Sequence, residues 1–178
     1  MERTPAPSVT VVAAEIRRRR PRIGKTKLHK LLYYVQGYHL AWEGAPAFRE
    51  NIEAWEKGPV VASLWRAERR RHYVESTDRP PEAVCNVVTY VLRRLGDKSG
   101  RQLIDATHAE TPWKTARRVG GSRTDEVISR QSLIDFFSSE SPDLQRIREA
   151  VAAEHDGSPF VPDPPGLREE LIADYRSK

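Results

Sequence analysis

Few residues of this chain have the types and the spacing that a catalytic site would need. His108 and Glu110 stand two residues apart in a polar and aromatic segment, residues 107–113, and could serve as a base and its partner. The sequence places no serine, cysteine or lysine to complete such a site. A capped turn in which His108 bonds the backbone, or a contact with a partner, explains the segment better. We therefore expect no catalytic residues and no enzymatic activity.

The sequence also argues against a nucleotide, a metal or another cofactor. Gly24-Lys25-Thr26 resembles the end of a phosphate-binding loop, but Arg19 stands where that loop needs a glycine. The five histidines do not pair at metal-binding helical spacing, and the chain has no CxxC motif. Cys85 is the only cysteine, so no disulfide can form within the chain. Its valine neighbours predict a small core residue.

The charge is moderately basic, with 30 Lys and Arg against 25 Asp and Glu. Two arginine clusters stand out. The first consists of Arg17, Arg18, Arg19, Arg20 and Arg22, and the second of Arg66, Arg69, Arg70 and Arg71. Such clusters can contact phosphates or an acidic protein, or simply lie solvated on the surface. All three interpretations stay open, and the first cluster is our candidate for contact with nucleic acid.

Tyrosine and tryptophan are dense in the middle of the chain: Tyr33, Tyr34, Tyr38, Trp42, Trp55 and Trp65. Most of these side chains must be core. Tyrosine and tryptophan also anchor protein interfaces, where they contribute much of the binding energy. Two or three of them could therefore line an exposed groove.

Helical periodicity dominates the elements that must position these residues. We expect a first helix from a Ser8 cap to about Arg19, and a second from about Thr26 to Glu43 that ends at Gly44. Further helices are expected from Pro59 to about residue 71, over 84–95, after the Ser99 capping box, after Thr111-Pro112, and through residues 133–137. Gly37 inside the second helix costs roughly 1 kcal/mol against alanine, which a close approach by another segment could explain.

The fold class that follows is mainly α: a compact multi-helix single domain over residues 8–140, with a small extended or hairpin insertion around residues 45–58. Residues 1–7 are expected to be a loose N-terminus. Residues 141–178 are expected to form a C-terminal helix, a proline-rich arm and a short terminal helix. No apolar run reaches the ~18 residues of a membrane span, and the N-terminus lacks a secretory signal. We expect a cytoplasmic protein without membrane contact.

Three blocks of the sequence resemble, in order, those of the Panacea, or SocA-like, antitoxin domain. They read KLHKLLYYVQGYHL over residues 27–40, IEAWEKGPVV over 52–61, and THAETPW over 107–113. The resemblance covers about residues 8–140. It implies a cytoplasmic antitoxin that binds and neutralises a cognate toxin protein, usually encoded by the adjacent gene.

The resemblance also implies two alternative activities. The founding member of the family is an adaptor that delivers its toxin to a cytosolic AAA+ protease, and many antitoxins bind the operator DNA of their own operon. For direct neutralisation we expect an aromatic surface near Tyr34, Tyr38 and Trp55 to bury against the toxin. The candidate toxin-binding residues are Tyr34, Tyr38, Trp42, Trp55, Lys57, Gly58, Pro59, His108, Glu110 and Trp113.

Overall fold

The computed structural model describes residues 5–70, 73–121 and 125–140. These residues form seven α-helices and one small antiparallel hairpin, so the mainly α fold class is confirmed. The C-terminal helix, proline-rich arm and terminal helix expected over residues 141–178 lie outside the described residues, as does most of the expected loose N-terminus.

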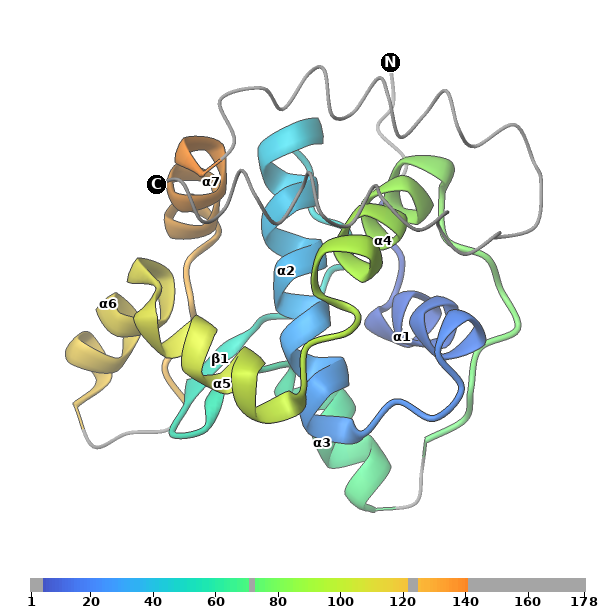
Figure 1. Cartoon of the computed structure of the whole chain (residues 1–178), viewed down its shortest axis with the longest axis horizontal. Coiled ribbons are helices and arrows are strands. Elements are labelled where there is room, and N and C mark those ends of the chain that lie inside the picture. Colours follow the sequence, from blue (N-terminus) through green and yellow to red (C-terminus); the bar gives the residue numbers. More distant parts are fainter. Residues whose placement is uncertain (1–4, 71–72, 122–124, 141–178) are drawn as a thin grey trace.

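The elements follow one another with short connections. The helices are α1 (Val9–Arg19), α2 (Lys25–Glu43), α3 (Ala62–Arg69), α4 (Glu82–Leu95), α5 (Gly100–Ala109), α6 (Thr111–Gly120) and α7 (Arg130–Ser139); the strands are β1 (Glu53–Trp55) and β2 (Gly58–Val60). Helix α2 runs through the middle, with α1 and α4 on one side and α6 and α7 on the other (Figure 1). Among the helices of the described residues, none combines the length and the hydropathy of a transmembrane span.

Helix α2 is the core of the fold on all of its faces. Residues 28–40 are all buried, which is more than the single apolar stripe that we expected. Its buried polar side chains form hydrogen bonds with the backbone of the loop that follows α2. The Gln36 amide accepts hydrogen bonds from the backbone N–H groups of Ala47 and Phe48, and His39 Nδ1 lies 2.7 Å from the carbonyl oxygen of Ala45.

Helix ends follow the local sequence signals closely. Ser8 and Ser129 cap α1 and α7, and Ser99 and Gln102 form the predicted capping box of α5. Gly44 ends α2 in the left-handed conformation, with φ +61°. The expected caps at Ser8, Ser99 and Gly44 are confirmed.

The predicted start of the third helix at Pro59 is wrong. Pro59 lies in β2, opposite Ala54 of β1, and α3 begins at Ala62. Ala54 and Pro59 face each other without exchanging hydrogen bonds, because the Ala54 N–H points away from β2 and donates to the carbonyl of Glu126 over 2.8 Å. No backbone N–H is therefore needed at residue 59, and the strand tolerates a proline there. Ile128 N–H likewise donates to the carbonyl of Ile52, so residues 126–128 extend the hairpin on its far side.

Candidate protein-binding site

A buried lysine holds the hairpin turn from below. Lys30 is 1% exposed, and its ammonium donates to the carbonyl of Pro59 over 2.9 Å. Burial lowers the pKa of Lys30 to about 8. Gly58 lies directly above it with φ +92°, and a Cβ there would stand 2.8 Å from Lys30 Cε and 2.9 Å from Thr107 Oγ1. The turn therefore needs a glycine both for its backbone conformation and for space.

Beside Lys30, a neutral histidine fixes the entry to α3. Nδ1 of His29 accepts the backbone N–H of Val61 over 3.3 Å. Burial and then the charge of Lys30 lower the pKa of His29 to about 3, so the ring is uncharged at neutral pH. The helix block 27–40 thus positions the hairpin through two adjacent polar side chains.

Glu110 joins the α5–α6 junction to the core. Its carboxylate accepts hydrogen bonds from the hydroxyl groups of Tyr33 and Tyr34 over 2.8 and 2.6 Å. Burial raises the pKa of Glu110 to about 7, although the two tyrosine hydroxyls favour its charged form. Glu110 is also the N-cap residue of α6, and the helix that we expected after Thr111-Pro112 begins at Thr111 itself.

Helix α6 clamps the hairpin from the side. Trp113 Nε1 donates to the carbonyl of Trp55 over 2.9 Å, and one turn later Arg117 reaches the carbonyl of Ala54 over 3.5 Å. The His108 ring stacks on Trp113 with centroids 4.0 Å apart and rings inclined by 18°. Burial, followed by the charge of Lys30, lowers the pKa of His108.

The outer surface of this assembly carries two more indole contacts. The Trp55 and Trp65 rings pack edge to face with centroids 5.0 Å apart, and the Arg69 guanidinium lies 5.2 Å from the Trp65 centroid. Trp55 Nε1 donates to Glu53, which Arg66 faces over 3.5 Å. We call the partly exposed Trp55, Trp65 and Trp113, with the cations Lys57, Arg66 and Arg69, the indole face.

Three aromatic candidates do not reach this surface. Tyr34, Tyr38 and Trp42 are 5%, 3% and 9% exposed. Phe137 packs edge to face on both tyrosines, and Tyr90 packs on Tyr38 and Trp42. The structure places these side chains in the core, not on the surface where we expected them, because they lie on a helix that is covered on every side.

Some of the remaining candidate toxin-binding residues are exposed, and others are buried beneath the surface. Lys57 is exposed in the turn, Trp55, His108 and Trp113 are partly exposed, and Gly58 and Pro59 are buried. Glu110 is held by the two tyrosines. The structure thus brings the second and third sequence blocks together around one hairpin.

The first arginine cluster is mostly engaged within the chain. Arg17 pairs with the nearly buried Glu68, while Arg18 and Arg19 both pair with Glu15 over 2.7 and 2.6 Å. Arg20 donates to a backbone carbonyl, and Arg22 is exposed in the α1–α2 loop. The side chains of Arg17 and Arg19 are only 20% and 13% exposed, whereas the Arg18 side chain is 38% exposed. Only part of this cluster is therefore accessible to phosphates.

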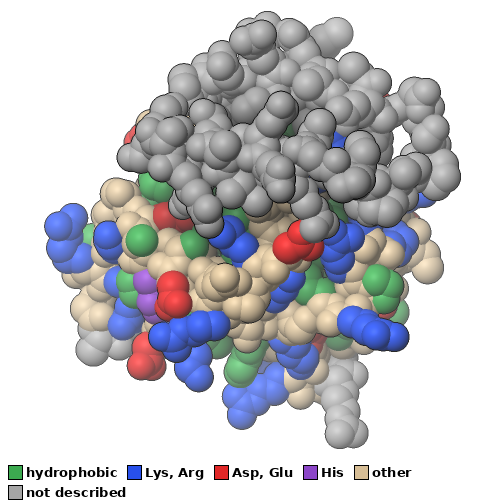
Figure 2. All heavy atoms as spheres, in the orientation of Figure 1, with side chains coloured by type: hydrophobic (Ala, Val, Ile, Leu, Met, Phe, Trp, Pro, Cys, Tyr) green, Lys and Arg blue, Asp and Glu red, His purple; other side chains and the backbone are tan. Residues whose placement is uncertain are grey.

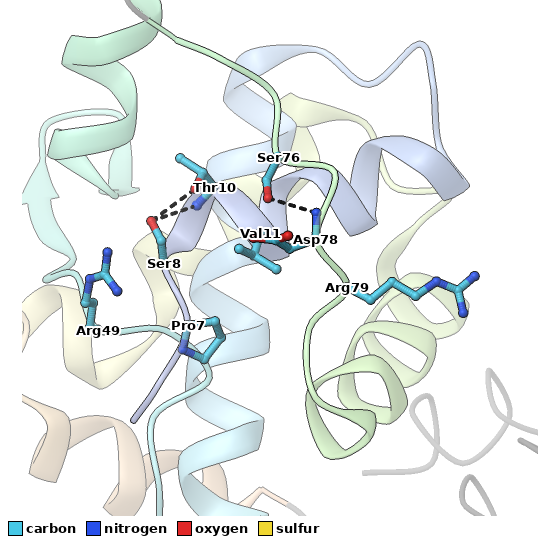
Figure 3. Close-up of a pocket in the computed structure, with 8 residues that line it drawn as sticks. All are labelled: Pro7, Ser8, Thr10, Val11, Arg49, Ser76, Asp78 and Arg79. Atoms are coloured by element: carbon cyan, nitrogen blue, oxygen red, sulfur yellow. Dashed lines mark hydrogen bonds between the residues drawn. The ribbon is translucent and has the colours of Figure 1, made fainter. Parts of the chain in front are cut away.

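A polar hollow lies elsewhere, between the start of α1 and the segment before α4 (Figure 3). Ser8 and Thr10 hydrogen-bond each other on one side and Ser76 bonds Asp78 on the other, while Arg79 points away. Glu50 already takes the Val9 N–H at the helix start over 2.8 Å. The hollow therefore presents no unfilled anion site at the helix start.

Four residues that build the site were not among the candidate toxin-binding residues: Lys30, Tyr33, Trp65 and Arg69. The position of Lys30 within an apolar helix segment could have indicated its role, because a lysine that is buried there needs a hydrogen-bond or charge partner. Trp65 and Arg69 are four residues apart, the spacing of side-chain neighbours on a helix. In the described part of the chain, no group of three or more His, Cys, Asp or Glu side chains could hold a metal ion.

Residues 28–114 match the family described as antitoxin SocA-like, Panacea domain. Comparison with curated proteins and with solved structures gave no match. The family indicates a toxin–antitoxin role, a toxin partner in general, and regulation without catalysis. The matched segment extends from the start of the buried run of α2 to the first turn of α6, and so includes the hairpin. The match confirms the resemblance drawn from the three blocks: residues 28–114 of this chain are similar to the antitoxin SocA-like, Panacea domain.

Proposed function

We propose that this protein is an antitoxin that neutralises a cognate toxin protein in the cytoplasm by binding it directly. The observation that carries the proposal is the family match over residues 28–114. The exposed part of that segment supports it, because tryptophan and arginine, the residue types enriched at binding hot spots, lie together on the indole face.

The mechanism that we propose is occlusion. A stable protein interface buries about 1,600 Å² in total. A toxin seated on the hairpin, α3 and α6 would cover the indole face and lose access to its own target. Binding of this kind requires no covalent step and no cofactor from the antitoxin.

The adjacent gene provides the test. Its product, expressed alone, should arrest growth, and co-expression of this protein should restore growth. The two proteins should also co-purify. The proposal fails if no product of the neighbouring genes arrests growth in a way that this protein reverses.

Toxin abundance during rescue separates occlusion from the alternative of delivery to an AAA+ protease. Under occlusion the toxin accumulates in a complex with this protein. Under delivery its level falls, and rescue is lost in cells that lack the protease. The second alternative, autoregulation through operator DNA, gains little support, because Arg17, Arg18 and Arg19 are paired with carboxylates of the chain itself.

A further inference from the structure

We propose that the indole face docks an acidic segment of the partner protein, with an apolar side chain against the Trp55–Trp65 pair and carboxylates on Arg69 and Lys57. This inference rests on the proposed function and specifies which surface and which partner chemistry it uses. Three observations support it: the indole face has an N–H donor without a hydrogen bond and cations without carboxylate partners among the described residues, hydrogen bonds hold the hairpin beneath it in place, and carboxylates lie among its cations.

The indole N–H groups differ in what remains available to a partner. Trp55 donates to Glu53, and Trp113 donates to the Trp55 carbonyl. Within the described residues, Trp65 makes ring contacts with Trp55 and Arg69 but no hydrogen bond through its N–H. Trp65 therefore offers both an apolar ring and an N–H donor to a partner's side chain.

The cations of the indole face differ from those of α1. In α1, Arg17, Arg18 and Arg19 have carboxylate partners within the chain. Over the described residues, Lys57 and Arg69 have none, and both are exposed. Figure 2 shows Lys and Arg side chains spread over the described part of one face, with smaller areas of Asp and Glu among them. An acidic partner complements cations that the chain itself leaves unpaired.

The support of the face is already ordered before binding. Lys30 fixes the turn from below, while Trp113 and Arg117 fix β1 from the side. Edge-to-face packing and the arginine contact limit the motion of the Trp65 ring. A preorganised surface loses less conformational entropy on association, which favours a stable complex.

The acidic groups within the face favour a protein partner over nucleic acid. Glu53 lies between Trp55 and Arg66, and Glu56 is exposed in the hairpin turn beside Lys57. Both carboxylates would repel a phosphate backbone. A protein segment can avoid them or place donors against them, since its charge varies along the chain.

Two charge reversals of the same kind provide the test. Arg69→Glu alters the face, and Arg79→Glu alters an exposed arginine between α3 and α4. The probe is the purified product of the adjacent gene, titrated by calorimetry at low and at high salt. We expect Arg69→Glu to weaken binding about tenfold or more and to reduce its salt dependence, while Arg79→Glu stays within about twofold of the parent.

Two further variants separate the indole contribution from folding. Trp65→Ala should weaken binding at least as much as Arg69→Glu, and Trp65→Phe should retain part of the affinity because it keeps an aromatic ring. Thermal unfolding of each variant shows which are folded. Reversal of an acidic toxin residue that the complex protects from hydrogen exchange should restore binding to Arg69→Glu.

The outcomes distinguish this inference from the proposed function. If the parent chain binds the toxin and folded Arg69→Glu and Trp65→Phe bind equally well, the docking surface is wrong and the antitoxin role stands. If the parent chain neither binds nor rescues, both fail. If Arg69→Glu loses binding to duplex DNA from its own promoter but keeps its affinity for the toxin, the face serves nucleic acid and the docking proposal is overturned.

Discussion

The ring of Phe137 in α7 lies where a side chain at Gly37 of α2 would have to be. A Cβ built on Gly37 would stand 2.1 Å from Phe137 Cε2, which is far inside van der Waals contact. The same ring packs on Tyr33, Tyr34 and Tyr38. The glycine in the middle of α2 therefore permits the close contact between α2 and α7.

Gly37→Ala should destabilise the fold by about 2 kcal/mol, because the added methyl group overpacks the Phe137 contact. Urea unfolding measures the change. Gly24→Ala is the matched control, since a Cβ at Gly24 meets nothing within 4 Å. In the double variant with Phe137→Leu, much of the alanine cost should disappear. Strictly additive effects would contradict the proposed contact.

Gly58→Ala should be costlier than Gly44→Ala. Both glycines have positive φ, +92° and +61°, but only Gly58 has Lys30 and Thr107 against its missing side chain. We expect about 1 kcal/mol for Gly44→Ala and about 2–3 kcal/mol for Gly58→Ala. Gly58→Ala should also weaken toxin binding, because it displaces the turn next to Trp55. Equal unfolding free energies for the two variants would show that the contact of residue 58 with Lys30 and Thr107 does not add to the cost of the substitution.

Lys30→Met should change the dependence of stability on alkaline pH. The pKa of Lys30 is lowered to about 8 in the folded chain, against about 10.4 when it is unfolded. Between these values the unfolded state binds more protons, so the Lys30 contribution to stability rises with pH. The unfolding free energy of the parent minus that of Lys30→Met should rise by about 2–3 kcal/mol across this window. A flat difference would mean that Lys30 is solvated.

Glu110→Gln should show that the contribution of Glu110 to stability falls with rising pH, which is opposite to the contribution of Lys30. Burial raises the pKa of Glu110 to about 7 in the folded state, against about 4.3 in the unfolded state. The Glu110 contribution is therefore fully present below about pH 4 and is lost as the pH rises to about 7. Denaturant titrations of the parent and of Glu110→Gln should show this difference falling with pH. A difference that rises over the same range would contradict the raised pKa.

Arg17→Ala should lower stability much more than Arg22→Ala. Arg17 pairs with Glu68, whose side chain is 4% exposed, and also lies 4.8 Å from the Tyr73 ring centroid. Its loss leaves a nearly buried carboxylate whose one remaining cation among the described residues is Lys25 at 3.9 Å, at a cost of about 2 kcal/mol or more. Arg22→Ala, in an exposed loop, should stay within about 0.5 kcal/mol. Thermal unfolding of both variants checks this difference.

Much of the fold could be predicted from the sequence, because its signals are local. Ser8, Ser99 and Gly44 mark helix ends through hydrogen bonds and backbone conformations that depend on only a few neighbours. Periodicity predicted the helices, and Gly37 marked a close approach without identifying Phe137 as its partner. The prediction failed at Pro59, where pairing with β1 and the Lys30 hydrogen bond override the helix-start preference.

The sequence by itself determined a mainly helical chain with three blocks that resemble those of an antitoxin domain. Only the tertiary structure decided which aromatic residues are core and which are surface. Tyr34 and Trp55 are equally good interface residues by type, yet one is buried between helices and the other lies on a hairpin with its indole partly exposed. The physical reason is that exposure and charge pairing depend on contacts between segments far apart in the chain, such as Trp113 with Trp55 and Arg17 with Glu68.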